Sequence, residues 1–505
     1  MDASPQARAP DGNAKPHVLV VPFPAQGHLL PLLDLVSLLA ARGLAITVAV
    51  TAGNAALLDP LVAAFPSVDA VVLPFPSSPL LPAGCGENAK DLPAGHLLRP
   101  FMASLAALRA PLLAWCKAQG QGRVTAMLSD FFMGWTQPLA AELGVPRVAF
   151  SPSSAFYLAM TESLWRHVPR RRRPDDPDEA VAFPEIPGSP SFPWRHLSSL
   201  FRRHVPGDEL SESIRRSFLW NQDSECVVVN SFADLEAPYL QLRQTGTGRR
   251  MLAVGPLSDA VGTANVDRGG KPAVATADVT AWLDARRDGS VVYVSFGTQY
   301  AMSPEHAACV ADALARSSAA FVWAVRRGTA VPDGFEAATA SRGVVIRGWA
   351  PQVQVLRHRA VGWFLTHCGW NSLLEAAAAG VAVLTWPVEA DQFTDAWQVA
   401  EAGVAVPVAE GADAMPDAGK VAEVIDAAVM GKEGCSVRER AVELSRKAAA
   451  AVAEGGTSHR DLEELSVLSS LVSNSVLMLL ACLPDASLEE IRDWVDQNQI
   501  RLLDV

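Results

Sequence analysis

The strongest constraint on the fold is an alternation of short apolar runs with helical sequence, which occurs in two blocks of this 505-residue chain. In the first block the apolar runs are residues 17–24, 45–50, 124–128 and 147–150. Runs without inside–outside alternation are typical of parallel strands, because a parallel sheet is buried on both faces. After the first run a helix is expected from Leu29, with Pro31 in its first turn and Gly43 at its end. This block therefore predicts a series of βαβ units.

The second block follows a Gly-, Asp- and Ala-rich segment with few large apolar residues. Its expected strands are residues 291–296, 320–325, 361–366 and 381–386. Two α/β blocks of similar size predict two Rossmann-like domains that face each other across a cleft. The expected boundaries are an N-terminal domain at 1–257, a linker at 258–272, a C-terminal domain at 273–466 and a helical extension at 467–505.

Composition and charge exclude several classes of function. A net charge of −12 argues against nucleic acid or an anionic membrane surface as the main partner, so an anionic ligand must be bound by local groups. The seven cysteines form no C-x-x-C pair, which fits a reducing compartment and gives no metal-site spacing. The N-terminus lacks the basic start and apolar core of a secretory signal. We therefore expect a cytoplasmic protein, and we expect it to be a monomer.

Two further segments bear on whether the protein binds a membrane or nucleic acid. The apolar part of the extension, residues 467–483, is shorter than the roughly 20 residues that span a bilayer. We expect a packed amphipathic helix there and an acidic helix at 488–497, without a transmembrane segment. The four arginines at 170–173 precede a run of acids, which favours a solvated loop over a nucleic-acid signal.

The stretch that begins at Trp349 and ends at Gln392 contains the groups needed to hold a sugar nucleotide. The tryptophan is large enough to cover the face of a base. The Gly-Trp-Asn-Ser step at 369–372 follows an apolar run, so it predicts a strand turning into a helix whose free N–H groups favour a diphosphate. Glu375 can accept hydrogen bonds from vicinal hydroxyls, and Asp391 with Gln392 offers acceptor and donor groups to a hexose.

Ordinary structural roles explain several of these residues singly. Ser372 and Glu375 fit the S-x-x-E pattern of a capping box at a helix start. Trp349 and Trp370 are also explained as core aromatics, and His367 as a hydrogen-bonded core histidine. These alternatives do not explain why all of the residues lie in one short stretch at fixed spacings.

The stretch 349–392 resembles the donor-binding signature of plant family-1 UDP-dependent glycosyltransferases at both ends, in length and at its internal fixed points. The resemblance implies an α/β protein of the GT-B fold with C-terminal helices, and a UDP-sugar as co-substrate without a metal or other cofactor. It assigns uracil to Trp349 and the Ala350 backbone, and ribose to Gln352 and Glu375. It assigns the diphosphate to His367, to the backbone of Gly369, Trp370, Asn371 and Ser372, and to the side chains of Asn371 and Ser372, and it assigns the sugar to Asp391 and Gln392. Ser295 and Thr298 resemble the second phosphate-side loop of the family.

The chemistry of the implied reaction needs a base for an acceptor hydroxyl. His28 follows the first strand, and imidazole suits proton abstraction near neutral pH. An imidazolium needs a carboxylate to orient and stabilise it, and Asp130 is the matching candidate in the family. The structural alternative for Asp130 is a helix N-cap.

The resemblance implies a single in-line displacement with inversion. His28 removes the acceptor proton, and the oxygen attacks the anomeric carbon on the face opposite UDP. The helix N-terminus near Asn371 is placed to stabilise the charge that develops on the leaving diphosphate. No D-x-D motif is suitably placed, so no metal is expected.

Other classes of protein fit less well. A nicotinamide dehydrogenase needs G-x-G-x-x-G after a strand, and residues 246–248 lack the third glycine. The P-loop pattern is absent. A non-catalytic UDP-sugar-binding protein is the remaining alternative; it could dispense with His28 or Asp130, and both are present.

The acceptor is expected to be a small, flat, apolar phenol such as a flavonoid. Five aromatic residues in the N-terminal block suggest such a site, although aromatics there are as often core: Phe131, Phe132, Trp135, Phe150 and Phe156. Residues 22–29 and 387–392 resemble the plant branch that acts on flavonols and phenolic acids. The resemblance implies glucose as the sugar, because glutamine at the position of Gln392 usually accompanies glucose in the family; its amide can also both donate and accept between adjacent hydroxyls. UDP-rhamnose or another UDP-sugar is the alternative.

Overall fold

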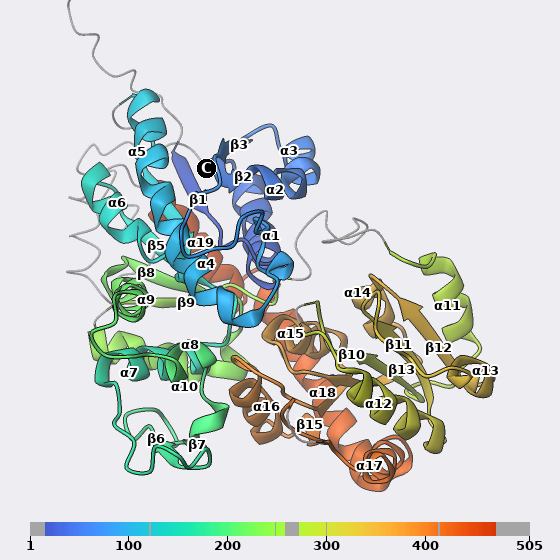
Figure 1. Cartoon of the computed structure of the whole chain (residues 1–505). Helices are drawn as coiled ribbons and strands as arrows, with labels where there is room; N and C mark the ends of the chain where they lie inside the picture. Colours follow the sequence, from blue (N-terminus) through green and yellow to red (C-terminus); the bar gives the residue numbers. More distant parts are fainter. Residues whose placement is uncertain are drawn as a thin grey trace, which may run out of the picture.

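In the computed structural model of the protein, two α/β domains lie side by side (Figure 1), as the two alternating blocks predict. The structure describes residues 16–120, 123–247, 249–257, 272–298, 300–412 and 415–470. The N-terminal domain is blue to green in Figure 1, and the C-terminal domain is yellow to orange. The expected arrangement of two Rossmann-like domains is confirmed.

The N-terminal domain is built on a seven-stranded parallel sheet with the order β3-β2-β1-β4-β5-β8-β9. Its strands are β1 (His17–Val21), β2 (Ala45–Thr51), β3 (Val68–Leu73), β4 (Ala126–Asp130), β5 (Arg147–Ser151), β8 (Cys226–Val229) and β9 (Met251–Ala253). Every residue of β1, β4, β5 and β8 is buried, because helices cover both faces. A small antiparallel pair, β6 (Ala180–Ala182) and β7 (Ser191–Pro193), lies outside this sheet.

Helices pack around this sheet and connect its strands. They are α1 (Gln26–Ala41), α2 (Ala52–Ala55), α3 (Asp59–Ala64), α4 (Leu98–Ser104), α5 (Arg109–Ala118), α6 (Thr136–Leu143), α7 (Ala155–His167), α8 (Ser199–Arg202), α9 (Glu209–Leu219) and α10 (Ala233–Thr247). Two apolar cores result, one on each face of the sheet.

The C-terminal domain contains a six-stranded parallel sheet with the order β12-β11-β10-β13-β14-β15. Its strands are β10 (Val291–Ser295), β11 (Ala320–Val325), β12 (Gly343–Arg347), β13 (Val361–Thr366), β14 (Ala382–Thr385) and β15 (Ala405–Pro407). Its helices are α11 (Thr276–Asp284), α12 (Pro304–Arg316), α13 (Phe335–Thr339), α14 (Gln352–Leu356), α15 (Trp370–Ala379), α16 (Gln392–Glu401), α17 (Ala418–Met430) and α18 (Lys432–Val452). The last described helix is α19 (Thr457–Ser470).

The strand orders locate the candidate site. The direction of strand addition reverses between β1 and β4 in the first sheet and between β10 and β13 in the second. Parallel sheets of this kind bind ligands beyond the carboxyl ends of the strands at such a reversal. The loops that follow these four strands are therefore the natural place for a site in each domain.

The first helix differs from its expected start. It begins at Gln26 rather than Leu29, because Pro22 and Pro24 end the strand and the N–H groups of His28 and Leu29 already donate to the carbonyl of Ala25. Pro31 is consequently the sixth residue of the helix and not part of its first turn. The N-terminal domain thus contains a proline inside a helix.

The expected C-terminal domain boundary at residue 466 is wrong. The last helix, α19, packs against β9 and β1 of the N-terminal domain (Figure 1), and its Leu462 and Leu465 are buried in that core. Asp461 Oδ2 accepts a hydrogen bond from the N–H of Ala253 at 2.7 Å. The chain returns to its first domain because the sheet leaves this apolar surface uncovered by its own helices.

Other expected segments lie largely outside the described residues. This applies to residues 258–271 of the expected linker and to residues 471–505, which contain most of the expected extension. Residues 467–470 continue α19. The linker and the two tail helices remain predictions.

The four arginines at 170–173 lie in a partly exposed loop, as expected. The N–H groups of Arg172 and Arg173 donate to the carboxylate of Glu179, and Arg173 forms an ion pair with Asp176. Arg171 lies over the ring of Trp194 at 4.7 Å. Neighbouring acids thus neutralise this run.

One helical run, Gly95–Ala118, is long and apolar enough to cross a membrane by length and composition. It contains α4 and α5, and its Phe101, Leu105 and Leu112 are fully buried in the N-terminal core. Core helices of globular domains meet the same criterion, and the packing favours that interpretation.

Candidate functional site

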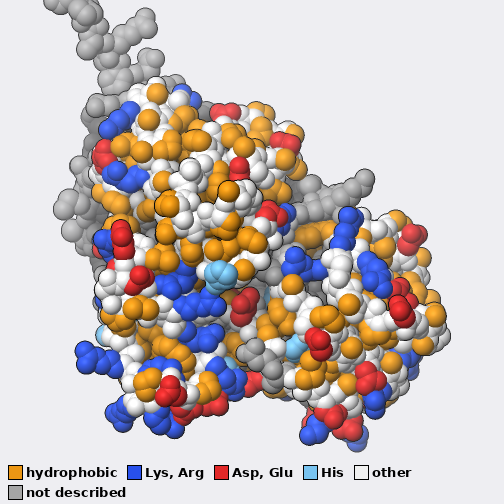
Figure 2. Space-filling model, viewed as in Figure 1, with side chains coloured by type: hydrophobic (Ala, Val, Ile, Leu, Met, Phe, Trp, Pro, Cys, Tyr) orange, Lys and Arg blue, Asp and Glu red, His pale blue; other side chains and the backbone are white. Residues whose placement is uncertain are grey.

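Figure 2 shows the surface hollowed between the two domains. The loops after β1 and β13 are in contact, since Nδ2 of Asn371 donates to the carbonyl of Gly27. On the N-terminal side, the Nδ1 atom of His28 lies 2.9 Å from Oδ2 of Asp130. The histidine side chain is 16 % exposed and the carboxylate is fully buried. Because the two residues follow adjacent strands, the sheet itself brings them together. The predicted base and its carboxylate partner are therefore in contact.

Asp130 also has the structural role of a helix N-cap. Its Oδ1 atom accepts a hydrogen bond from the N–H of Phe132 at 2.8 Å and caps the short helix at Phe131–Met133. Each carboxylate oxygen has a different partner, so the two roles coexist. A carboxylate on Nδ1 favours the tautomer that carries its proton there, which leaves Nε2 of His28 as the basic atom.

Aromatic rings surround the histidine. The ring of Phe131 is stacked with that of His28 at 5.8 Å, Phe132 lies at 4.6 Å and Phe23 at 5.1 Å. Phe132 is only partly buried, so it offers an apolar surface beside the base. A flat, apolar molecule can lie against such a surface.

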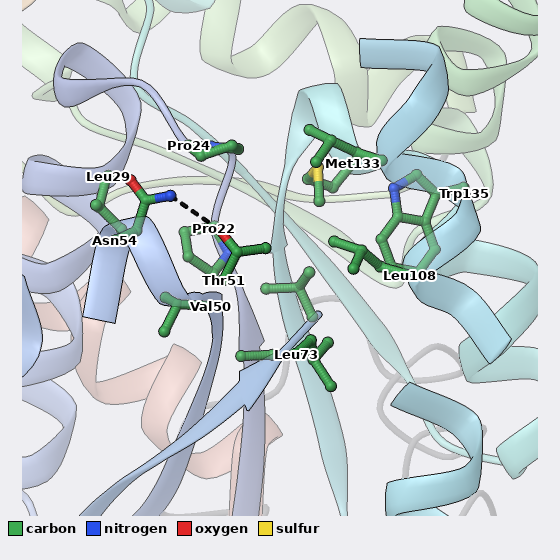
Figure 3. Close-up of a pocket in the computed structure, with 13 residues that line it drawn as sticks. Pro22, Pro24, Leu29, Val50, Thr51, Asn54, Leu73, Leu108, Met133 and Trp135 are labelled. Carbon is green, nitrogen blue, oxygen red and sulfur yellow. Dashed lines mark hydrogen bonds between the residues drawn. The ribbon is translucent and has the colours of Figure 1, made fainter. Parts of the chain in front are cut away.

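Only one of the five expected acceptor aromatics, Phe132, keeps an accessible surface. Phe131 is 1 % exposed and is stacked on His28, and the other three are also buried. Phe150 and Phe156 are fully buried, since one lies in the middle of the sheet and the other packs against Trp397. Trp135 is also buried, at 4 % exposure, and lines a separate apolar cavity with Leu108 and Met133 (Figure 3). Core packing accounts for all three.

The cavity in Figure 3 lies where β1, β2 and β3 end. It holds about 20 Å³ of free space, room for about one water molecule, and its lining includes Pro24 and Leu29, which flank the loop of His28. Asn54 and Thr51, hydrogen-bonded to each other at 3.0 Å, are its polar residues. The cavity extends the apolar surroundings of the base on the N-terminal side.

On the C-terminal side, the two residues assigned to ribose are in contact. Nε2 of Gln352 donates to Oε2 of Glu375 at 2.7 Å and lies 3.3 Å from Oγ of Ser372. The capping-box alternative is wrong, because the N-cap of α15 is Gly369 and Ser372 is the third residue of the helix. Trp349 and Ala350, which precede α14, are half-buried. The tryptophan therefore retains an accessible surface.

The start of α15 is an anion-binding element. The first intrahelical bond in this turn runs from the N–H of Leu373 to the carbonyl of Gly369, so the N–H groups of Trp370, Asn371 and Ser372 have no acceptor within the helix. Free N–H groups and the helix dipole both favour a negative group here.

His367 connects the two loops assigned to the diphosphate. A Cβ added at Gly297 would lie 2.7 Å from its ring, and one at Gly369 would lie 2.8 Å from its Nε2 atom. Glycine is required at 297 for a second reason, its φ of +73°. Ser295 and Thr298 are thus placed beside His367, as the resemblance implies. Burial lowers the pKa of His367 to about 4, so its ring is neutral near pH 7 and has one N–H donor and one acceptor nitrogen.

Strained backbone marks both ends of this region. Cys368 has a φ of +66° and Ala390 a φ of +59°, although neither is a glycine. Each immediately precedes a group assigned to the donor, Gly369 or Asp391. Residues held in this conformation cluster at functional sites, because the surrounding structure must stabilise them.

The residues assigned to the sugar lie at the start of α16. Oδ2 of Asp391 accepts a hydrogen bond from Oγ of Ser153 in the N-terminal domain at 2.8 Å. Burial raises the pKa of Asp391, and the hydrogen bond from Ser153 and the charge of His28 counteract this shift. Asp391 is thus bound to the N-terminal domain through Ser153.

The side-chain oxygen of Gln392 is not available to a sugar hydroxyl. Its Oε1 atom accepts hydrogen bonds from the N–H groups of Val388 and Glu389, both at 2.9 Å. The turn before α16 needs an acceptor for these groups, and the glutamine supplies it. Only Nε2 remains for a sugar hydroxyl, so the expectation that the amide both donates and accepts is corrected.

Two residues of the donor stretch contact the N-terminal domain. Nε1 of Trp370 donates to the carbonyl of Asn230 at 2.7 Å, and the ring is 3 % exposed, as its structural alternative predicts. Nδ2 of Asn371 donates to the carbonyl of Gly27 at 2.7 Å. Trp370 thus acts as an interdomain contact rather than as a surface open to ligand.

Sequence reasoning missed Ser153 and Asn230. Both come directly after strands, β5 and β8, at the same edge of the sheet as His28. The rule that site residues follow parallel strands applies to them equally, but no spacing singles them out. Among the described residues, no group of three or more His, Cys, Asp or Glu side chains could hold a metal ion.

Comparison with known families gives two matches. A model described as UDP-glucoronosyl and UDP-glucosyl transferase matches residues 264–435. A model described as glycosyltransferase, N-terminal domain, matches residues 15–147. The two together span both domains of the structure.

Similar proteins agree with these matches over nearly the whole chain. The flavonol 3-O-glucosyltransferase UGT89B1 of Arabidopsis thaliana is 45% identical over 463 residues, which cover 89% of this chain and 95% of the relative. The flavonol 7-O-rhamnosyltransferase of the same plant is 34% identical, with 89% and 97% covered. The solved structure of Arabidopsis thaliana UGT89C1 complexed with UDP-L-rhamnose superposes with a TM-score of 0.75 at 33% identity, covering 91% of this chain and 100% of that chain. Its complex with quercetin gives a TM-score of 0.73 at 32% identity, with 90% and 100% covered.

Proposed function

The chain belongs to the family of UDP-dependent glycosyltransferases, and from that premise we propose that it transfers glucose from UDP-glucose to a hydroxyl of a flavonol or another small phenol. The observation that carries the proposal is the contact of His28 with Asp130, a base paired with a carboxylate at the carboxyl ends of adjacent strands. From the C-terminal domain, Asp391, the carboxylate proposed to bind the sugar, contacts Ser153 at the same edge of the N-terminal sheet.

In the proposed reaction, Nε2 of His28 accepts the proton of the acceptor hydroxyl while Asp130 stabilises the imidazolium that forms. The acceptor oxygen bonds to the anomeric carbon as the bond from that carbon to the UDP oxygen breaks, so the configuration inverts. The negative charge passes to UDP, where the N–H groups at the start of α15 stabilise it. The reaction needs no metal or other cofactor.

Glucose is favoured over rhamnose because glutamine at the position of Gln392 usually accompanies glucose in this family. Asp391 and Nε2 of Gln392 together offer an acceptor and a donor to adjacent hydroxyls. The glucosyltransferase relative is also more similar than the rhamnosyltransferase relative, at 45% against 34% identity. UDP-L-rhamnose is the second candidate, because the solved structure with this ligand is similar over 91% of the chain.

Flavonols are favoured as acceptors by the surroundings of the base. Phe132 and the cavity of Figure 3 give this side of the cleft an apolar lining. The relatives include two named as flavonol glycosyltransferases. We further propose a cytoplasmic monomer, as composition indicates.

One assay tests donor and acceptor together. Release of UDP is measured for UDP-glucose, UDP-galactose, UDP-xylose and UDP-rhamnose with a panel of flavonols and phenolic acids, and proton NMR determines the anomeric configuration of the product. We expect the β-glucoside of a flavonol from an α-linked donor. The His28→Ala variant is the control and should lose at least about a hundredfold in rate while binding UDP normally.

The outcomes separate the alternatives. A clear preference for UDP-rhamnose would overturn the donor assignment but retain the transferase. Tight binding of UDP without turnover, for any pair of substrates, would leave a non-catalytic sugar-nucleotide-binding protein. A product with retained configuration would exclude the in-line displacement.

A further inference from the structure

The proline inside α1 exposes a carbonyl group beside the base. Pro31 has no N–H, so the carbonyl of Gly27, four residues earlier, has no α-helical donor. Gly27 immediately precedes His28 in the sequence. The missing hydrogen bond is supplied by the C-terminal domain, since Nδ2 of Asn371 donates to this carbonyl at 2.7 Å. An unpaired carbonyl created by a proline is thus held by an amide 344 residues away.

This contact is one end of a directed chain of hydrogen bonds. A carbonyl can only accept, so Nδ2 of Asn371 must face Gly27 and its Oδ1 must face Asn230, whose Nδ2 lies at 3.3 Å. Oδ1 of Asn230 in turn accepts from the N–H of Leu257 at 3.0 Å. The Gly27 carbonyl at one end and the Leu257 N–H at the other determine which amide atom each asparagine presents. The oxygen and nitrogen of Asn371 and of Asn230 therefore cannot exchange places.

Asn230 is itself tightly enclosed. A Cβ added at Gly255 would lie 2.4 Å from its Oδ1 atom. Its carbonyl accepts the hydrogen bond from the buried ring of Trp370. The chain of hydrogen bonds therefore connects rigid parts of both domains and ends at the turn that carries the base.

We propose that Pro31 and Asn371 are positioning residues that set the place of His28 relative to the bound UDP-sugar. The proline leaves the Gly27 carbonyl available, and the asparagine uses its side chain to hold it, while the backbone N–H groups of α15 remain for the diphosphate. This proposal rests on the proposed function, in which His28 is the base. It adds a second role to Asn371, which the resemblance assigned to the diphosphate.

The Pro31→Ala variant tests this role. Alanine restores an N–H that can donate to Gly27 within the helix and so compete with Asn371. Because alanine is the best helix former, the melting temperature should not fall. The kcat should decrease about fivefold, the effect of one hydrogen bond, with the KM for UDP-glucose unchanged within about twofold. A merely structural proline would give the opposite pattern, a change in stability without a selective loss of kcat.

Pro238 provides a matched control. It is also the sixth residue of an N-terminal-domain helix, α10, but lies far from His28 in the sequence. Pro238→Ala should retain the kcat of the wild type. The double variant Pro31→Ala, Asn371→Ala should be no slower than Asn371→Ala alone, because both changes remove the same contact. Wild-type kcat in Pro31→Ala, or losses that multiply in the double variant, would overturn the proposal.

Amide hydrogen exchange tests the hydrogen bond between Asn371 and the Gly27 carbonyl independently of turnover. In unliganded protein, Asn371→Ala should increase exchange in residues 25–32, and Pro238→Ala should not. If the wild type releases no UDP with any donor, the proposed function fails, and this measurement still decides the contact. Unchanged exchange in Asn371→Ala would show that the asparagine does not hold the turn.

Discussion

At the scale of single residues, the site depends on side chains whose atoms have separate partners. Asp130 uses one oxygen to orient His28 and the other to cap a turn, and Gln392 uses its carbonyl on its own loop and keeps only its N–H₂ group for ligand. A substitution that changes one atom can therefore separate catalysis from folding. The next prediction uses this property.

Asp130→Asn should inactivate the enzyme without unfolding it. The retained Oδ1 still accepts from Phe132, but the new amide places an N–H₂ group opposite Nδ1 of His28. The imidazole must then change its tautomer, which puts the proton on Nε2 and removes the base. By analogy with serine proteases we expect kcat to fall by about 10²- to 10⁴-fold, with normal UDP affinity and melting temperature. Turnover within threefold of the wild type would remove Asp130 from the mechanism.

Trp349→Ala and Glu375→Ala should weaken UDP binding directly. Stacking on a base is worth about 1–3 kcal/mol, so calorimetry should show affinity reduced by about tenfold or more. Trp282 is a half-buried tryptophan of the same domain that lies under Arg286, and Trp282→Ala is the matched control. Equal UDP affinity in all of these proteins would contradict the assignment of Trp349 and Glu375 to the nucleoside.

At the scale of elements, α7 and α16 meet across the domain boundary through buried acids. Ser154 caps α7 and donates to Oδ1 of Asp395 at 2.8 Å, whereas Oδ2 of Asp395 has no hydrogen-bond partner among the described residues. Glu236 accepts from the first N–H groups of α7 and from Nε2 of Gln398. Burial raises the pKa of Asp395 well above its usual value, and burial also raises the pKa of Glu236. This interface is therefore most stable when its acids are protonated.

The contribution of this interface to the stability of the protein should accordingly decrease as the pH rises. An acid with a raised folded-state pKa contributes stability that is complete below its unfolded pKa of about 4 and is lost as the pH rises through the folded value. Asp395→Asn removes this dependence and keeps the acceptor for Ser154. We expect its melting temperature at pH 8 to exceed that of the wild type by about 2–6 °C, with a smaller difference at pH 5.

The exposed Asp312, paired with Arg316, provides the control for this measurement. Asp312→Asn should change the melting temperature little at either pH, because exposed ion pairs contribute little. If the Asp395→Asn protein melts at a lower temperature than the wild type at pH 8, then the charged carboxylate of Asp395 stabilises the folded state, and the prediction is wrong.

At the scale of the whole molecule, the chain crosses between the domains more than once. It leaves the N-terminal domain after Leu257 and returns through α19, whose Glu463 and Glu464 form ion pairs with Arg42 and Arg250. The two domains are thus connected at both ends of the C-terminal domain. Their relative position is restrained by these crossings and by the contacts that Asn371 and Asp391 make across the cleft.

Leu465→Ala should destabilise the N-terminal domain, although the residue lies near the other end of the chain. Its side chain is fully buried against the N-terminal sheet, and the resulting cavity should cost about 2–4 kcal/mol. Hydrogen exchange in β1 and β9 should rise more than exchange in β10. Val442→Ala, on the exposed side of α18, is the control. Selective loss of protection in the C-terminal sheet would contradict the packing of α19.

Local patterns in the sequence predicted the four strands around the reversal point of each sheet and the groups at their ends, but not β3, β8 and β9 of the first sheet or β12 and β15 of the second. The strands at Ala320–Val325 and Val361–Thr366 have the expected bounds, because continuous apolar runs are a direct consequence of burial on both faces. The contact of His28 with Asp130 follows from the same logic, since both residues come at the ends of neighbouring parallel strands. The contact of Gln352 with Glu375 agrees with their shared assignment to ribose.

Only the tertiary structure decided what meets across the cleft. Ser153 on Asp391, Asn230 on Trp370 and the return of α19 join residues that are far apart in the sequence, and no periodicity or spacing encodes such pairs. The role of Pro31 also depends on the tertiary structure, because Asn371 of the other domain donates to the Gly27 carbonyl that the proline leaves without a helical donor. A chain specifies which faces and ends its elements present, but the docking of one domain on another determines which of those groups become neighbours.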